Sequence, residues 1–403
     1  MLSHIFIWPL SALAFTALAF LQPQLHNPQL PLHDLTKKSP LLTLHRNLVE
    51  IESITGNEHA VGSFLVKYLR SHNLTVDIHP VSSPSSDSKH KHPSRFNIHA
   101  YIGSNRTTST LLTSHIDTVP PYYPYHTTKH SMQIWGRGSV DAKAAVAAQI
   151  TAFQELRTDN KFHEGSIGLL FVVGEETGGD GMRAVNDLKL SWDAVIFGEP
   201  TDGRLACGHK GFLGFTLQAK GKAAHSGYPW LGRSANSILI PALMALEGLN
   251  GKERLPSSEK YGESTLNVGR IEGGVAANVV AERGSAGAAI RIAGGTVGEV
   301  RGIVLEAVDE ATRDLLGEDG HLEVVFPSEG YGPVDIDCDV EGFETVTVNY
   351  GTDIPNLHGD HKRYLYGPGS ILVAHSDHEH LSVKELEKAV EDYKKIVLAC
   401  LAK

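Results

Sequence analysis

Cysteine is scarce in this sequence of 403 residues. Only Cys207, Cys338 and Cys400 are present, and they lie far apart along the chain. An odd number of widely spaced cysteines builds neither a disulfide framework nor a thiolate zinc site. At most one disulfide bridge can form, so any metal ion in this protein must be held by histidine and carboxylate side chains.

The sequence also lacks a dense run of lysine and arginine. It has 36 basic and 46 acidic residues, which gives a formal net charge of −10. Proteins that bind nucleic acid need a clustered basic face to contact phosphates, so nucleic acid is not an expected partner. The composition, 41% apolar and 20% charged, favours neither disorder nor a coiled coil. A chain of this length is expected to form two domains.

One long, mainly apolar run is present, and it lies at the N-terminus. It covers residues 5–20, which is short for a membrane span of roughly 20 residues. Ala17 and Ala19 match an A-x-A cleavage site, so we interpret residues 1–19 as a secretory signal peptide and residues 20–38 as a linker or pro-region. Because no lysine or arginine precedes the run, a signal anchor or a buried core segment stay open as alternatives.

Two further features concern the fate of the mature chain. The triplets that begin at Asn73 and Asn105 are glycosylation sequons and fit a secreted glycoprotein. No segment after the first resembles a membrane-spanning helix, so stable membrane insertion is not expected after the signal peptide is removed.

Short apolar runs alternate with helical patterns over the first half of the chain. This alternation predicts an α/β fold, in which helices flank a mixed sheet. The strand-like runs are 98–102, 109–114, 166–174 and 193–198, and the helical patterns are 41–54, 59–72, 142–157 and 181–188. The polar stretch 82–94 is typical of a solvated loop. Asp141 directly precedes the helical pattern 142–157 and is a good candidate for its N-cap.

The pattern changes near Gly208. The order becomes strand, helix, strand, strand, helix, strand, which is the ferredoxin-like βαββαβ plan. These elements are expected at 211–220, 234–249, 264–271, 286–293, 297–316 and 321–326. We therefore expect an inserted domain at 209–323, and a first domain that comprises 39–208 and 324–403 and ends on an amphipathic helix at 383–402.

Acidic and histidine residues follow four strand-like runs directly. They are His115, Asp117, Glu175, Glu176, Glu199 and His375. Ligands of open α/β sheets bind beyond the carboxyl ends of the strands, so these side chains are expected to meet at one rim. Imidazole and carboxylate groups are zinc ligands, and they also suit cobalt and manganese respectively. Singly, each residue has an ordinary explanation as the start of a loop; together they indicate a metal site.

Four segments resemble the signature segments of one metallopeptidase family. They are 114–120 (SHIDTVP), 136–144 (GRGSVDAKA), 174–179 (GEETGG) and 197–201 (FGEPT). The family includes acetylornithine deacetylase, succinyl-diaminopimelate desuccinylase, aminoacylase and glutamate carboxypeptidase, and the resemblance extends over roughly residues 40–403. It implies a zinc-binding α/β domain with an inserted ferredoxin-like lid or dimerisation domain. It also implies two zinc ions per subunit, with cobalt or manganese as alternatives.

The resemblance implies a role for each residue at the rim. His115 and Glu199 match the ligands of one metal ion, Glu176 and His375 match those of the other, and Asp141 matches the carboxylate that bridges both. Asp117 matches the carboxylate that orients a ligand histidine, and Glu175 matches the general base. The last segment, 374–379 (AHSDHE), departs from the usual A-H-x-x-D-E because His378 stands where aspartate is common. His358, His361 and His380 are also near, which puts the assignment of the last ligand in doubt.

Segments 221–227, 267–280 and 290–292 of the inserted region also resemble family segments. The resemblance implies that His225 reaches an active site, usually that of a partner subunit, and polarises the scissile carbonyl. It implies that Asn278 and Arg291 bind the carboxylate of the substrate, although Arg291 also fits an ordinary solvated strand residue. A homodimer through the inserted domain is compatible with these roles.

The sequence thus predicts a secreted hydrolase that cleaves a peptide or amide bond next to a free carboxylate. A carboxypeptidase is favoured over an N-acyl-amino-acid deacylase, because a secreted enzyme meets peptides rather than biosynthetic intermediates. A metal-binding protein without catalysis is a third hypothesis, and the presence of Glu175 argues against it.

Overall fold

The computed structural model describes residues 39–82, 95–128, 132–251 and 254–402. The expected signal peptide and linker, and most of the expected loop 82–94, lie outside these described residues. Among the helices within these ranges, none is both long and apolar enough to cross a bilayer.

A six-stranded mixed sheet forms the centre of the first part of the molecule, which confirms the predicted α/β fold class. Its strand order is β1-β2-β6-β3-β7-β15, and β3 runs parallel to both β6 and β7. The strands are β1 (Thr75–Val81), β2 (Arg95–Tyr101), β3 (Thr110–His115), β6 (Ile167–Val172), β7 (Ala194–Gly198) and β15 (Lys362–Tyr366). β3, β6 and β7 are buried along their whole length, because helices and loops cover both faces of the sheet.

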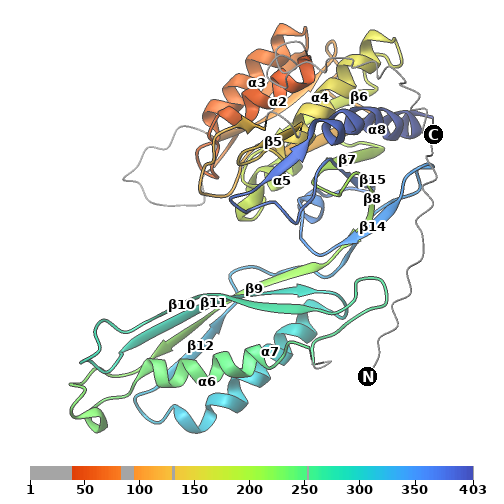
Figure 1. The fold of residues 1–403 in the computed structure, drawn as a ribbon. Helices are drawn as coiled ribbons and strands as arrows, with labels where there is room; N and C mark the ends of the chain where they lie inside the picture. The colour runs from red at the N-terminus through yellow and green to blue at the C-terminus, as the bar shows by residue number, and fades with distance from the viewer. Residues whose placement is uncertain (1–38, 83–94, 129–131, 252–253, 403) are drawn as a thin grey trace, which may run out of the picture.

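Four helices lie together along the upper side of this sheet in Figure 1. They are α2 (Pro40–Glu50), α3 (His59–Ser71), α4 (Lys143–Thr158) and α8 (Val383–Leu401). Helix α4 is rich in alanine and packs against both α2 and α8, since small side chains let neighbouring elements approach closely. The shorter α5 (Asp180–Val185) lies on the other side of the sheet.

The expectation that Asp141 caps helix α4 is wrong. The cap residue is Ala142, and no side chain makes a capping hydrogen bond there. The carboxylate of Asp141 instead lies between His115 and His375. Its side chain therefore belongs to the rim of the sheet rather than to the helix end.

Two small three-stranded sheets complete the first part. One joins β8 (Leu205–His209), β13 (Val334–Asp335) and β14 (Thr345–Val348), and the other joins β4 (His126–Thr127), β5 (Gln133–Trp135) and β16 (His380–Ser382). The second of these sheets pairs β16 with β5, which brings segment 374–379 next to segment 136–144.

A four-stranded sheet with its own hydrophobic core forms the second part. Its strand order is β10-β11-β9-β12, and two helices cover one face (Figure 1). The elements are β9 (Gly211–Lys220), α6 (Ala235–Glu247), β10 (Thr265–Gly273), β11 (Arg283–Ile292), α7 (Val297–Thr312) and β12 (His321–Val325). Strand β12 ends two residues beyond the expected boundary at 323. Whether this part acts as a lid or in dimerisation stays a prediction.

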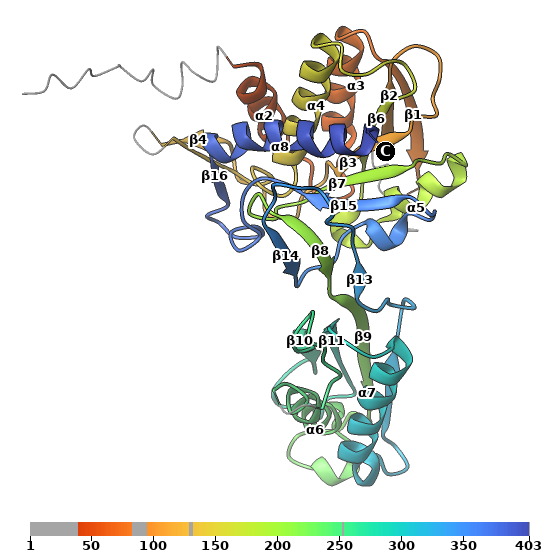
Figure 2. The ribbon, with the colours of Figure 1, turned by 90° about the vertical axis from the view of Figure 1, so that its right-hand side faces the viewer.

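The two parts are joined at a narrow place, which Figure 2 shows most clearly. The chain passes from β8 into β9 on the way out and returns after β12 through β13. A disulfide between Cys207 and Cys338 links these two passages. The prediction that the chain forms at most one bridge agrees with this pairing.

Candidate active site

The carboxyl ends of the parallel strands β3, β6 and β7 lie at one edge of the central sheet, which we call the rim. His115 is the last residue of β3 and pairs with Val172 of β6, while Ser114 pairs with Gly198 of β7. The short 3-10 turn η1 (Glu175–Thr177) follows β6, and Glu199 directly follows β7. The carboxyl ends of parallel strands meet at the same edge, so these chain-distant side chains become neighbours.

His115 faces two carboxylates across this rim. Its Nε2 atom lies 3.0 Å from Oδ1 of Asp141 and 3.7 Å from Oε2 of Glu199. Its other ring nitrogen, Nδ1, lies 3.0 Å from the backbone oxygen of Asp117 and 3.5 Å from the Oδ1 atom of the same residue. Since the backbone oxygen of Asp117 can only accept, Nδ1 is the donor in this contact, and in the neutral imidazole the lone pair of Nε2 would point toward Asp141 and Glu199.

His375 completes the other half of the rim. Its Nε2 atom lies 3.0 Å from Oε2 of Glu176 and 3.3 Å from Oδ2 of Asp141. The two oxygens of Asp141 thus face two different histidines, which is the arrangement that a carboxylate shared by two metal ions requires. The backbone of His375 has a φ of +61°, a left-handed conformation that aims its ring at the rim. His378 points instead to Asp377, and His380 stacks on Trp135.

The residues present at this rim fit divalent cations. Oε1 of Glu176 is buried and has no hydrogen-bond partner among the described residues. Ligand atoms around a tetrahedral zinc ion lie roughly 3.3 Å apart, because each bond is about 2.0–2.2 Å long, and the separations at the rim run from 3.0 to 3.7 Å. Ligand atoms of His115, Asp141 and Glu176 lie within 4.8 Å of one another, and so do those of His115, Glu175 and Glu199. The two groups share His115 and are therefore contiguous.

The charges at the rim need a counter-charge. Burial raises the pKa of Glu175 well above its ordinary value, and the carboxylate of Glu199 raises it further. Burial likewise raises the pKa of Glu199 to about 7. Burial alone would lower the pKa of His115, but the surrounding carboxylates, Glu199 foremost, outweigh it and raise that pKa. Acidic groups that crowd together in this way are stabilised by protons or by bound cations.

The carboxylate of Asp117 contacts several of the groups that form the rim. Its side chain accepts hydrogen bonds from the hydroxyl of Thr55 at 2.7 Å and from the backbone N–H groups of Glu175 at 3.1 Å and Glu176 at 3.3 Å. It also contacts His115, so one carboxylate orients both the histidine and the turn that carries the two glutamates. The predicted positioning role of Asp117 is consistent with these contacts.

Glu379, which the sequence did not single out, orients the backbone at Asp141. Its Oε1 atom accepts hydrogen bonds from the backbone N–H groups of Val140 at 2.9 Å and Asp141 at 3.1 Å, and its Oε2 atom pairs with Arg137 at 2.7 Å. Both charged side chains are almost fully buried. A glutamate at the end of the segment AHSDHE was the one available signal.

Asp353, which the sequence did not single out, lies directly before the 3-10 turn η5 (Ile354–Asn356). One of its oxygens accepts a hydrogen bond from Asn356 at 2.9 Å, while the other is buried without a partner among the described residues. Burial raises the pKa of Asp353 to about 6, and its charge in turn raises the pKa of Glu175. Nothing in its sequence segment distinguished it from a turn residue.

Arg291 lies on β11, near the joint between the two parts. Its guanidinium group stacks over the ring of Phe212 at 5.0 Å. Burial raises the pKa of Tyr331 to about 12, and the charges of Arg291 and Glu175 both act on the same hydroxyl. Arg291 and Glu175 of the same chain therefore lie close enough to this tyrosine for both charges to act on it.

His225 and Asn278 lie elsewhere, on neighbouring loops of the second part. The backbone N–H of Ser226 donates to the carbonyl of Asn278, and His225 forms an isolated bridge with Val279. Both residues are exposed, and within the described ranges no contact joins either of them to the rim of the same chain. The structure thus brings seven predicted residues together at the rim and leaves these two apart.

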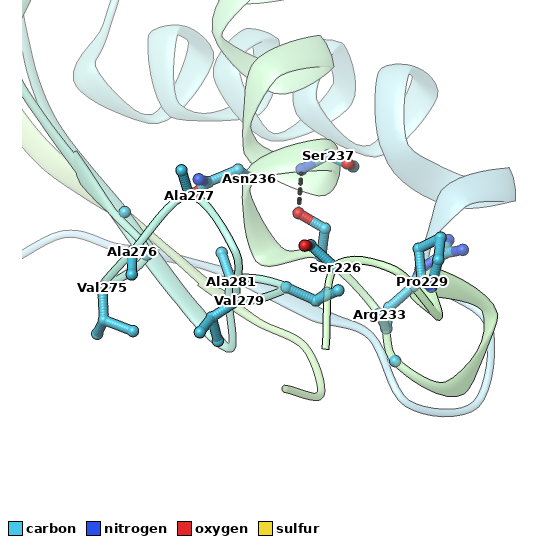
Figure 3. A pocket seen from close by; sticks show the side chains of 15 residues that line it. Ser226, Pro229, Arg233, Asn236, Ser237, Val275, Ala276, Ala277, Val279 and Ala281 are labelled. Carbon is cyan, nitrogen blue, oxygen red and sulfur yellow. Dashed lines mark hydrogen bonds between the residues drawn. The ribbon is translucent and has the colours of Figure 1, made fainter. Parts of the chain in front are cut away.

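A hollow of about 770 Å³ lies beside these two loops. Figure 3 shows Val275, Ala276 and Val279 along one of its sides and Ser226 and Pro229 along another. The start of helix α6 closes it, where the hydroxyl of Ser234 accepts a hydrogen bond from the N–H of Ser237.

Comparison with known proteins places the chain among peptidases. Residues 111–399 match the model of Peptidase family M20/M25/M40. A probable carboxypeptidase of Neosartorya fischeri is 50% identical, over 92% of this chain and 88% of that protein.

Solved structures share the fold. An M20 family metallo-carboxypeptidase from Sulfolobus solfataricus superimposes with a TM-score of 0.69 at 17% identity, covering 91% of this chain and all of the other. A Bacillus subtilis protein described as a dinuclear metal-binding peptidase of the M20 family gives a TM-score of 0.59 at 15% identity, covering 92% of this chain and 97% of the other chain. At these identities the likeness concerns the fold alone.

Proposed function

This chain belongs to peptidase family M20/M25/M40 and is a metallopeptidase, and from that premise we propose that it is a secreted carboxypeptidase that uses two zinc ions. The observation that carries the proposal is the position of Asp141. Its two oxygens face His115 and His375, and each histidine is accompanied by a glutamate, Glu199 or Glu176. A site with this symmetry suits a pair of cations better than a single one.

The proposal assigns five side chains to the metal ions. His115 and Glu199 would hold one ion, His375 and Glu176 the other, and Asp141 both. When bound, such a pair supplies Lewis acidity that makes a water molecule acidic near neutral pH. Cobalt or manganese would fit the same donors.

Glu175 would move the proton. Its carboxylate belongs to the same cluster as His115 and Glu199, but the proposed ligand set does not use it. It would accept a proton from the attacking water and deliver it to the leaving amine, which lets one group serve as base and then as acid. Asp117 would keep this geometry fixed through its bonds to the backbone of the glutamate turn.

Substrate specificity would come from the second part of the molecule. Arg291 would bind the terminal carboxylate of the peptide, since a guanidinium group pairs with a carboxylate through two parallel hydrogen bonds. Asn278 would assist it, and His225 would polarise the scissile carbonyl. Because His225 and Asn278 are remote from the rim of their own chain, the proposal has them act on the site of a partner subunit.

The surface of the second part supports a homodimer. On helix α6, Ile240 and Met244 are one turn apart and are 56% and 71% exposed. Strand β10 is the edge of its sheet, and Ile271 on it is 62% exposed. Exposed apolar side chains next to an unpaired strand edge are typical of an interface between subunits.

Secretion is the remaining part of the proposal. The disulfide between Cys207 and Cys338 fits an oxidising compartment. Asn73 and Asn105, the two expected glycosylation sites, are both exposed. Mass spectrometry of protein recovered from culture medium would test removal of residues 1–19 and sugar at both asparagines.

An N-acyl-amino-acid deacylase is the alternative, because it would use the same rim. Purified protein assayed on a panel of dipeptides and of N-acetyl amino acids would separate the two. Activity confined to the acetylated compounds would refute the carboxypeptidase assignment.

The role of Glu175 has its own test. We expect Glu175→Gln to keep its metal content and to lose about 10²–10⁴-fold in kcat, the range for removal of a general acid–base group. Exposed Glu272→Gln serves as the matched control. An unchanged rate would remove Glu175 from the mechanism, and unchanged zinc content with lost activity would exclude a purely structural effect.

A further inference from the structure

A second group of metal-ligand side chains lies on the edge of the central sheet, away from the rim. Asp77 and His79 are on β1, and His99 is on β2. One ligand atom from each residue lies within 4.8 Å of the others. None of the three takes part in the site described above.

The register of the two strands explains why the three side chains meet. Asp77 pairs directly with His99 across the antiparallel ladder, and His79 pairs with Asn97. Side chains alternate between the faces of a strand, so residues 77, 79, 97 and 99 all point to the same face. The opposite face carries Val76 and Ile98, which belong to the hydrophobic core beneath helix α3.

His99 is the unusual member of the group. Its side chain is fully buried, yet neither of its two ring nitrogens has a hydrogen-bond partner among the described residues. Nε2 of His79 is also buried and unpartnered. Buried polar groups are nearly always hydrogen-bonded, and an unpartnered one calls for an explanation such as a bound ion.

The neighbouring Asn97 shows that this part of the sheet can satisfy its polar side chains. Asn97 is just as buried, but its amide donates to the carbonyl of Gly181 at 2.7 Å and accepts from the N–H of Val173 at 3.2 Å. The side chain of His99, two residues along the same face of the strand, lacks such partners on both of its ring nitrogens.

The charged groups around the cluster are few. Asp77 accepts a hydrogen bond from the hydroxyl of Tyr101 at 3.1 Å through one oxygen, which leaves the other oxygen for a ligand. Arg106 is the nearby cation, and its charge acts on both histidines. Burial lowers the pKa of both imidazoles, that of His99 to about 4, and so favours their neutral form. A neutral imidazole is the form that binds metal.

We propose that Asp77, His79 and His99 form a separate binding site for one divalent transition-metal ion, with zinc as the best match. Two imidazoles and one carboxylate are a common zinc ligand set, and a water molecule or a further ligand would take the fourth position. Such an ion would satisfy the open nitrogens of His99 and His79 and would tie β1 to β2 at the edge of the sheet.

Zinc content of variants tests this site independently of the catalytic one. The full chain carrying Asp141→Asn, which removes the proposed bridging carboxylate, is dialysed against micromolar Zn²⁺ and analysed by atomic emission. We expect about one zinc ion per chain in this variant and none when His79→Gln is added, because the loss of one of three ligands abolishes tight binding. His358→Gln, an exposed histidine elsewhere, is the matched control and should keep the ion.

The single variant His79→Gln gives a second test that leaves the catalytic site unaltered. His79→Gln alone should bind one zinc ion fewer than the unaltered chain while its rate of peptide hydrolysis stays the same.

Replacement of zinc by Co²⁺ gives a third test. It should give a visible absorption band from the edge site in Asp141→Asn, and this band should vanish in the double variant. Equal zinc contents with and without His79→Gln, or an absorption band indifferent to it, would overturn the proposal. If Asp141→Asn itself loses no metal, the proposed two-zinc centre fails while the edge site is still decided by His79→Gln.

Discussion

The rim of the central sheet and the outer loops of the inserted sheet differ in how far one chain completes them. At the rim, His115, Asp141 and Glu199 are buried, and His115 contacts both carboxylates directly. At the outer loops, His225 and Asn278 are exposed, and within the described residues they contact the two neighbouring loops on which they lie. A single chain therefore assembles the proposed metal ligands but leaves part of the proposed substrate site open. In the proposal, the chemistry belongs to a region that is buried and the recognition of substrate partly to one that is exposed.

Substitution of Asp141, at the centre of the rim, should reduce activity the most. Asp141→Asn should lower kcat/KM by at least ~10³-fold, because one carboxylate faces both proposed cations and an amide is a poor ligand for them. Metal analysis together with peptide hydrolysis would measure this. Asp319→Asn, an exposed aspartate of the inserted part, is the control. Full activity in Asp141→Asn would contradict the assignment of the rim as the metal centre.

Variants of His225 test whether the exposed loops of the inserted part complete the site of another chain. His225→Ala should lower kcat by about 10²–10³-fold, the range for loss of one donor to a developing oxyanion. Mixing this variant with Glu175→Gln should restore activity, because each chain supplies what the other lacks. Random pairing of subunits would return about a quarter of the unaltered activity, since half the dimers are mixed and each has one intact site.

The outcome of mixing distinguishes the two possible geometries. If the inserted part folded over the rim of its own chain, no mixture would recover activity. Recovery that rises with subunit exchange, followed by size-exclusion chromatography, would establish action between subunits.

A smaller loss, of metal affinity, is expected when Glu379 is substituted. Glu379→Gln removes the charge that pairs with Arg137 and that accepts from the backbone of Asp141. Loss of a group that orients a ligand typically weakens metal binding by about 10–100-fold. Titration with a competing chelator would measure the affinity, and Glu385→Gln at the start of α8 offers an exposed comparison. An unchanged metal affinity would show that the segment 136–144 holds its shape without Glu379.

A still smaller change is expected in the free energy of unfolding, which should depend on pH through the buried His45. Nε2 of His45 donates to the carbonyl of Ser139 at 2.9 Å, and burial lowers its pKa to about 4. The unfolded chain takes up a proton near the ordinary pKa of about 6.5 while the folded chain does not, so stability falls as pH falls below that value. Between pH 6 and 5 this histidine should cost about 1 kcal/mol of unfolding free energy.

Chemical denaturation of the metal-free protein at both pH values would test this. His45→Gln should reduce the pH-dependent loss by about that amount, whereas exposed His358→Gln should leave it unaltered. An equal loss in all three proteins would show that His45 does not contribute to the pH dependence.

The sequence predicted the long elements well. The strand expected at 211–220 is β9, and the helix expected at 142–157 is α4, displaced by one residue. Strands such as β4 and β13 have two residues each, which is too short for a hydrophobic period to emerge. Their existence depends on partners far away in the chain.

The site was predictable only in part for the same reason. His115, Glu175, Glu176 and Glu199 could be located from the strands that they follow, and a resemblance supplied their roles. The strand-like run expected before His375 forms turns instead, so only the resemblance located this histidine. The role of Glu379 could not be predicted in this way, because it depends on hydrogen bonds to backbone groups 238 and 239 residues away in sequence. The helix-capping role expected of Asp141 was wrong: helix α4 begins at Lys143 with Ala142 at the cap position, and the carboxylate of Asp141 contacts two histidines instead.

The bridge between Cys207 and Cys338 has a consequence for how the molecule survives damage. It encloses the whole inserted sheet within a covalent ring, since the two cysteines are 131 residues apart in sequence and β9 to β12 lie between them. A protease that cuts an exposed loop between them opens the ring without releasing a fragment. In an environment full of other proteases, the nicked enzyme would stay in one piece, and it would separate into two bands on a gel only after reduction.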